Sequence, residues 1–233
     1  MTAGMKQDKC RVIVWGAGGH GKVIVDALLA SESCTLVGIL DDDETKSGTN
    51  VLGVPVSYSA GSLRTFRQSR DFDYVAIGIG DNYIRSEKFQ QVKACGLEPM
   101  NVIHPSAHIS RFVELGIGVT ILAGAVINPG AVIEDNVCVN TAASIDHDNY
   151  LEASCHIFPN ATLTGGVRVG RFAYVGSGAV VAPNLVVHQY SQVGAGAVVL
   201  RDVAEGALVA GVPAIEIGKQ PKRPEQFGAE ACR

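Results

Sequence analysis

The chain has 233 residues, of which 47% are hydrophobic and 18% charged, and its formal net charge is −4. This length can bury one large core or two small ones, and the charge offers no basic footprint for nucleic acid or an anionic membrane surface. Residues 1–9 are polar, no stretch is long enough to span a bilayer, and the six cysteines show no C-x-x-C spacing. We therefore expect a reduced, cytoplasmic protein without a signal peptide or membrane span.

The first hundred residues predict an α/β domain. We expect strands at 11–15, 35–40 and 73–79, a short apolar piece at 54–56, and helices at 22–30, 63–70 and 82–95. Strands that alternate with helices indicate a small parallel sheet, here a half-Rossmann domain over residues 1–102. A polar tail is expected at 219–233.

Between these segments a six-residue period runs along the chain. Starting at Ile103 and stepping by six to Val199, all seventeen positions are Ile, Leu or Val. A second, mostly small residue follows four positions after each. Neither a helix nor an alternating strand produces this period, whereas a parallel β-helix with three short strands per coil does. We therefore expect a β-helix over residues 103–218, with eighteen residues per coil.

A glycine loop follows the first expected strand. Gly16, Gly18 and Gly21 fit G-x-G-x-x-G, and Asp41 lies twenty residues further on. A nicotinamide enzyme is disfavoured, because the domain holds about half of a doubly wound sheet and no catalytic apparatus follows it. We favour a half-site for one nucleotide, with Gly18, Gly19 and His20 near phosphate or sugar and the acids Asp41 and Asp42 accepting hydrogen bonds from base or ribose. Alternatively, the glycines only permit a tight turn.

Two histidines of the β-helix are candidates for chemistry. His147 lies between Asp146 and Asp148, and an adjacent carboxylate raises the basicity of an imidazole and can hold one tautomer. This suits a general base near neutral pH, although by position alone a solvated surface histidine is the commoner explanation. His156 is the second candidate, with capping or packing as its alternative role. A zinc site is not expected, because the histidines lack a ligand spacing.

The chain resembles a known enzyme family along most of its length. The segments that carry the resemblance, between Arg11 and about Ile217, are VIVWGAGGHGKV, ILDDD, AIGIGDNYIR, NTAASIDHDNYLEASCHIFPNATLTGGVRVG and AGVPA. They are similar to the sugar acyltransferases of the sialic acid O-acetyltransferase type. The likeness is greatest to bacterial enzymes that N-acetylate UDP-4-amino-4,6-dideoxy sugars for glycan or glycoprotein biosynthesis.

The resemblance implies a left-handed β-helix, a homotrimer, and acetyl-CoA as co-substrate without a metal. It further implies His147 as the base, with Asp148 raising its basicity, and His156 near the thioester. Main chain around Gly165, Ser177 and Ala195 is implied to line the coenzyme A groove. The implied nucleotide-sugar residues are Gly18, Gly19, His20, Asp41, Asp42 and Gly80.

We therefore expect an acetyltransferase that acts on the 4-amino group of a nucleotide-linked 4-amino-4,6-dideoxy sugar. Three alternatives remain open: an O-acetyltransferase of sialic acid-type sugars, a β-helical carbonic anhydrase, and a non-catalytic nucleotide-sugar-binding scaffold. The sequence leaves open the base, the sugar stereochemistry and the glycan pathway.

Overall fold

The computed structural model describes residues 9–59, 63 and 71–219. Its α/β part contains these elements: β1 (Cys10–Trp15), α1 (Gly19–Ser31), β2 (Cys34–Asp41), the short 3₁₀ helix η1 (Glu44–Lys46), β3 (Asn50–Val51), β4 (Val54–Tyr58), β5 (Tyr74–Ile77), α3 (Asn82–Ala94) and β6 (Glu98–Pro99). The predicted helix at 63–70 lies outside the described residues except for the buried Leu63.

The sheet has the order β3-β4-β2-β1-β5-β6, and only the β3–β4 pair is antiparallel. Alternate residues of β1 face opposite sides of this sheet, as a strand requires. Val12 and Val14 pack with α1, whereas Ile13 and Trp15 pack with Val92 at the end of α3. The two helices therefore cover opposite faces of the sheet, and both faces of β1 are apolar.

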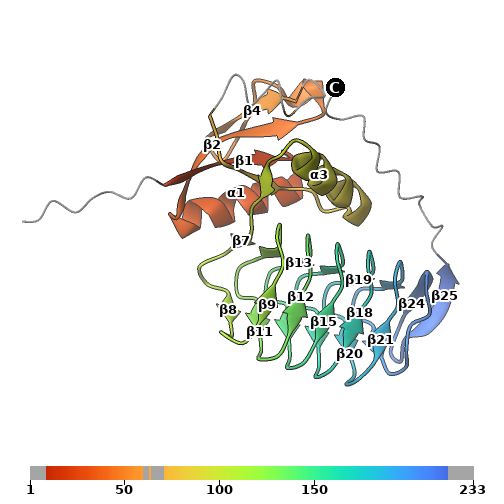
Figure 1. Cartoon of the computed structure of the whole chain (residues 1–233). Helices are drawn as coiled ribbons and strands as arrows, with labels where there is room; N and C mark the ends of the chain where they lie inside the picture. Colours follow the sequence, from red (N-terminus) through yellow and green to blue (C-terminus); the bar gives the residue numbers. More distant parts are fainter. Residues whose placement is uncertain (1–8, 60–62, 64–70, 220–233) are drawn as a thin grey trace, which may run out of the picture.

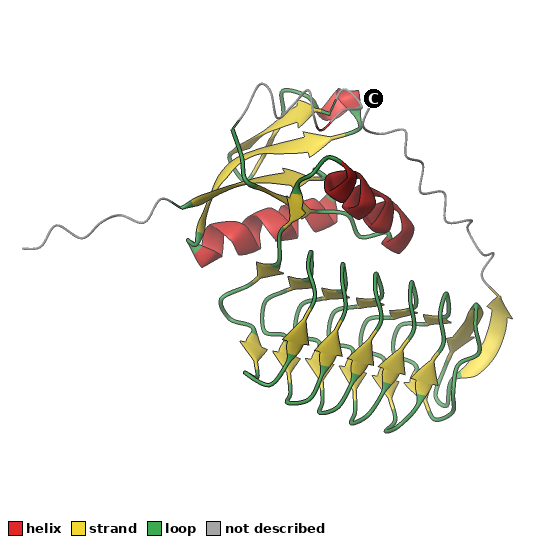
Figure 2. Cartoon of the chain, viewed as in Figure 1, coloured by secondary structure: helices red, strands yellow, loops and turns green. Residues whose placement is uncertain are grey.

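From Val102 to Val199 the chain forms a parallel β-helix of two-residue strands joined by short corners, and two longer strands that pair antiparallel follow it (Figure 2). Sheet I consists of β7 (Val102–Ile103), β10 (Thr120–Ile121), β13 (Cys138–Val139), β16 (His156–Ile157), β19 (Tyr174–Val175), β22 (Gln192–Val193), β24 (Ala207–Ala210) and β25 (Ile215–Lys219). Sheet II consists of β8 (His108–Ile109), β11 (Val126–Ile127), β14 (Ser144–Ile145), β17 (Thr162–Leu163), β20 (Val180–Val181) and β23 (Val198–Val199). Sheet III consists of β9 (Glu114–Leu115), β12 (Val132–Ile133), β15 (Tyr150–Leu151), β18 (Arg168–Val169) and β21 (Val186–Val187).

The register confirms the predicted coil of eighteen residues. Cys138 pairs with His156, and His156 pairs with Tyr174. The large apolar residue of each repeat points into the interior, where most positions are fully buried. Ile103 is an exception at 37% exposure, because it lies in the first coil and no earlier coil covers it. Burial of these repeating side chains supplies the main stabilisation of the β-helix.

The α/β part lies over one side of the β-helix, next to sheet I (Figure 1). α3 makes the polar part of this junction. Asn82 donates to the carbonyls of Phe172 and Ala173, and Tyr83 stacks on Phe172 with 4.8 Å between ring centroids. Val102 and Leu122 of the first coils join the apolar core beneath α1. These contacts bring the glycine loop close to sheet I.

Candidate active site

The glycine loop between β1 and α1 packs so closely against the first turn of α1 that one position has room only for glycine. A Cβ atom at Gly21 would lie 1.9 Å from the carbonyl oxygen of Gly16, so the loop and helix approach each other at van der Waals limits. Gly18 and Gly19 face open space, and α1 begins at Gly19 without a side-chain cap. The backbone N–H groups of this first turn can therefore face an anion such as a phosphate.

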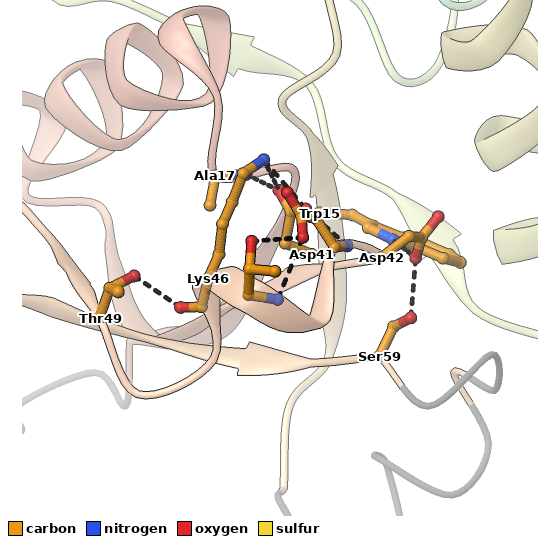
Figure 3. A network of polar contacts seen from close by, with 9 residues as sticks. Trp15, Ala17, Asp41, Asp42, Lys46, Thr49 and Ser59 are labelled. Atoms are coloured by element: carbon orange, nitrogen blue, oxygen red, sulfur yellow. Dashed lines mark hydrogen bonds and ion pairs between the residues drawn. The ribbon is translucent and has the colours of Figure 1, made fainter.

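Asp41 and Asp42 anchor this loop and its surroundings (Figure 3). Asp41, at the end of β2, is 8% exposed and accepts hydrogen bonds from the backbone N–H of Ala17 (2.6 Å) and Asp43 (2.9 Å). Its carboxylate also pairs with the ammonium group of Lys46 at 3.0 Å. Both oxygens of Asp41 thus have partners within the chain, and its direct effect is to hold the glycine loop.

Asp42 belongs to a second set of contacts. It accepts hydrogen bonds from Nε1 of Trp15 (3.0 Å) and Oγ of Ser59 (2.7 Å) and pairs with the Lys88 ammonium at 2.6 Å. Burial raises the pKa of Asp42, but the hydrogen bonds from Lys88, Ser59 and Trp15 outweigh this and lower it overall. Its carboxylate is 48% exposed and remains accessible to a ligand.

Two of the predicted site histidines meet where the glycine loop touches sheet I. The rings of His20 and His156 lie 5.9 Å apart between centroids. His156 is 2% exposed, with Nδ1 3.4 Å from the carbonyl oxygen of Gly80 and Nε2 3.1 Å from Nδ2 of Asn140. These partners assign the proton to Nδ1, because an amide nitrogen donates and a carbonyl accepts.

Burial and the Arg85 guanidinium lower the pKa of His20 to about 4 and that of His156 well below its ordinary value. Both imidazoles are therefore neutral at pH 7.

Arg85 itself joins the two parts of the chain. It is 1% exposed and donates to four backbone carbonyls, those of Gly80 (3.2 Å), Asn136 (3.2 Å), Ser154 (3.0 Å) and Cys155 (3.2 Å). The carbonyl of Gly80 consequently faces both Arg85 and His156, which fixes the loop that enters α3 against the β-helix. Sequence analysis did not predict this role, since Arg85 lies in an expected helix where a charged residue normally faces solvent.

His147 lies elsewhere, at the corner where the chain passes from sheet II to sheet III. Its Nδ1 is 2.8 Å from Oδ2 of Asp148, and both side chains are exposed. The hydrogen bond with Asp148 and the nearby carboxylate of Asp146 raise the pKa of His147. With Nδ1 donating to Asp148, Nε2 carries the lone pair that can accept a proton.

Gly165 lies directly beside this imidazole, one coil further along. A Cβ atom at Gly165 would be 2.5 Å from Cε1 and from Nε2 of His147. The other residues expected near coenzyme A, Ser177 and Ala195, follow β19 and β22 at the corner between sheets I and II. One chain therefore places the expected coenzyme A residues at two different corners, and His156 lies with His20 and Gly80 instead of with Gly165.

Within residues 9–59, 63 and 71–219, no group of three or more His, Cys, Asp or Glu side chains could hold a metal ion. No helix in the same part of the chain is long and apolar enough to cross a membrane.

Known proteins share this fold. The PglD N-terminal domain family matches residues 11–92. GDP-perosamine N-acetyltransferase of Escherichia coli O157:H7 is 26% identical, over 89% of this chain and 96% of its own length. A variant of perosamine N-acetyltransferase from Caulobacter crescentus, solved with CoA and GDP-perosamine, is 38% identical, with a TM-score of 0.82 and coverage of 89% of this chain and 97% of its own.

The acetyltransferase domain of PglB from Neisseria gonorrhoeae FA1090, solved with acetyl coenzyme A, is 35% identical with a TM-score of 0.81. It is matched over 90% of this chain and 100% of its own. The fold and these relatives thus define an acyltransferase built on a parallel β-helix. The chain belongs to the left-handed β-helix sugar acyltransferase family that these enzymes represent.

Proposed function

We propose that the chain transfers the acetyl group of acetyl-CoA to the 4-amino group of a nucleotide-linked 4-amino-4,6-dideoxy sugar, with His147 as general base. The observation that carries this proposal is the His147–Asp148 pair, which leaves Nε2 of an exposed, basic imidazole free to accept a proton. The family supports the substrate classes, since relatives were solved with CoA, acetyl coenzyme A and a GDP-linked sugar.

In this mechanism Nε2 of His147 takes a proton from the amine as its nitrogen attacks the thioester carbonyl carbon. The C–N bond forms, the C–S bond breaks, and the protonated imidazole returns its proton to the departing sulfur. Asp148 keeps the imidazole in the required tautomer and stabilises the imidazolium. Backbone N–H groups of the corners stabilise the thioester oxyanion.

We assign the nucleotide to the α/β part. The neutral histidines His20 and His156 lie on the same side of the site. Gly18, Gly19 and the N-terminus of α1 face the phosphates, and Asp42 faces the base or ribose. His20 and His156 lie beside the Gly80 loop, where the sugar enters. Both ring nitrogens of His156 have partners in Gly80 and Asn140, so His156 orients this region and does not donate to the thioester oxygen.

We further propose that the enzyme is a homotrimer with sites shared between subunits. His147 and His156 are half of an eighteen-residue coil apart, on a corner and on a sheet that face different directions. One active site cannot contain both histidines within a single chain, but a cyclic trimer would bring a corner of one β-helix beside sheet I of the next. Each site would then contain His147 and Gly165 of one subunit. The neighbouring subunit would contribute its α/β part together with Ser177 and Ala195.

Acetyl-CoA consumption against a panel of nucleotide-linked amino sugars, with matched hydroxy sugars as controls, tests the reaction. His147→Ala should lower kcat by about 10²–10⁴-fold while coenzyme A affinity stays unchanged. A variant that keeps most of its kcat refutes the general base. Turnover of the hydroxy sugars alone would assign O-acetylation instead.

Mixed trimers test the shared site. If His147→Ala and His156→Ala are each inactive, mixed trimers contain some sites with both histidines intact and should regain part of the activity. Mixed trimers that form, as shown by two affinity tags, and remain inactive would refute a site shared between subunits.

A further inference from the structure

One polar residue interrupts an apolar column in the β-helix. The fourth residue of each corner between sheets II and III points into the interior, and in four other coils it is apolar: Val113, Ala131, Val167 and Leu185. In the coil that carries His147 this residue is Asn149, which is 1% exposed. An aliphatic side chain at this position is therefore compatible with the β-helix.

The amide of Asn149 is directed at the main chain around His147. Its Nδ2 lies 2.8 Å from the carbonyl oxygen of Asp146, 3.3 Å from that of His147 and 2.9 Å from that of Thr164. Its Oδ1 is buried without a hydrogen-bond partner. A buried, unpaired oxygen destabilises a fold, and an aliphatic residue would avoid it. Stability therefore does not explain why this coil has an asparagine.

The three carbonyls belong to the two segments that set the position of the imidazole. Asp146 and His147 form the corner itself, and Thr164 directly precedes Gly165, against which the ring lies. From the outer side, the Asp146 carboxylate accepts the N–H of His147 at 2.8 Å and the amide of Asn128 at 2.9 Å. Asn149 contacts the same corner from the interior, and its hydrogen bond to Thr164 links this corner to the next coil.

We propose that Asn149 is a positioning residue for acetyl transfer, which holds Nε2 of His147 in place by tying the carbonyls of Asp146, His147 and Thr164 together. The proposal rests on the proposed role of His147 as general base. Asn149 touches neither substrate, so its removal should change the rate of the chemical step and leave both substrates bound as before.

The test compares Asn149→Ala and Asn149→Val with the unchanged enzyme. We expect kcat to fall by about 10- to 100-fold, since a displacement on the order of 1 Å has this effect on a catalytic group. Both KM values should stay within about twofold, and the thermal midpoint should shift by no more than about 4 °C. Asn149→Ser retains one donor and should recover part of the lost kcat.

Leu185→Ala is the matched control, two coils further in the same column. It removes apolar packing, so it should lower the thermal midpoint and leave kcat unchanged. If folded Asn149→Ala or Asn149→Val keeps the original kcat, the proposal is wrong. If all three Asn149 variants fail to fold, the asparagine is structural and the proposal is equally overturned.

A double variant separates this proposal from the general base on which it rests. In the His147→Ala background, Asn149→Ala should cause no further loss, because the group that it positions is gone. An equal loss in both backgrounds shows that Asn149 acts elsewhere and overturns the proposal. Retained activity of His147→Ala alone refutes the general base, and that result does not depend on any Asn149 variant.

Discussion

Gly165→Ala tests the geometry of the proposed base with the smallest possible change. The φ of Gly165 lies outside the left-handed region, so its backbone conformation is open to alanine. The corresponding positions in the same corner are Pro183 in the next coil and Pro129 two coils back, which shows that this corner accepts a side chain. What excludes a Cβ atom at Gly165 is the imidazole of His147.

The size of the effect follows from the distance. The new methyl carbon would lie 2.5 Å from Cε1 and Nε2 of His147, whereas carbon atoms in contact are about 3.5–4.0 Å apart. The ring must therefore move by on the order of 1 Å, and a displacement of this size lowers the rate by about 10²-fold. That is about 2.7 kcal/mol in the activation barrier.

Steady-state kinetics with acetyl-CoA and the preferred nucleotide amino sugar measures this effect. We expect kcat of Gly165→Ala to fall by about 10²-fold with a nearly unchanged thermal midpoint. In the His147→Ala background the same substitution should be harmless, because the smaller side chain leaves room for the methyl group. This background is the control for a general disturbance of the corner.

Two results would refute the reasoning. A folded Gly165→Ala enzyme with unchanged kcat would mean that the position of the imidazole does not limit the reaction. A loss of the same size in the His147→Ala background, accompanied by a higher KM for acetyl-CoA, would mean that Gly165 acts only through the coenzyme A groove.

Three further variants test other parts of the site. Asp148→Asn removes the main cause of the raised pKa of His147, so the base form should persist to lower pH. The rising acidic limb of the kcat–pH profile should move to lower pH at a reduced plateau, and an unmoved limb contradicts this role of Asp148. Arg85→Met removes the guanidinium that donates to four carbonyls, of which those of Gly80 and Cys155 keep a second donor, and should lower the free energy of unfolding by about 3 kcal/mol in urea titrations. An unchanged midpoint contradicts the assigned junction. Asp41→Ala frees the backbone of Ala17 and should raise KM for the nucleotide sugar only; a rise for acetyl-CoA instead would place the donor in the glycine loop.

The sequence by itself determined the architecture, because the interactions that define it are local and repeated. A large aliphatic residue at every sixth position can be buried only if each coil repeats the previous one, so the period predicts both the β-helix and its eighteen-residue register. The strand–glycine loop–helix pattern likewise predicts the start of the α/β part. His147 with Asp148 could also be identified from neighbouring residues, since their hydrogen bond joins adjacent positions.

The tertiary structure decided which distant residues share a site, because docking of the α/β part on sheet I brings them together. Only this contact places His20 beside His156 and buries both, which makes them neutral despite their ordinary appearance in sequence. It also buries Arg85, whose charge can be accommodated there because four carbonyl dipoles surround it. The closeness of Gly165 to the imidazole depends on how two coils stack, which a linear pattern of residues does not record.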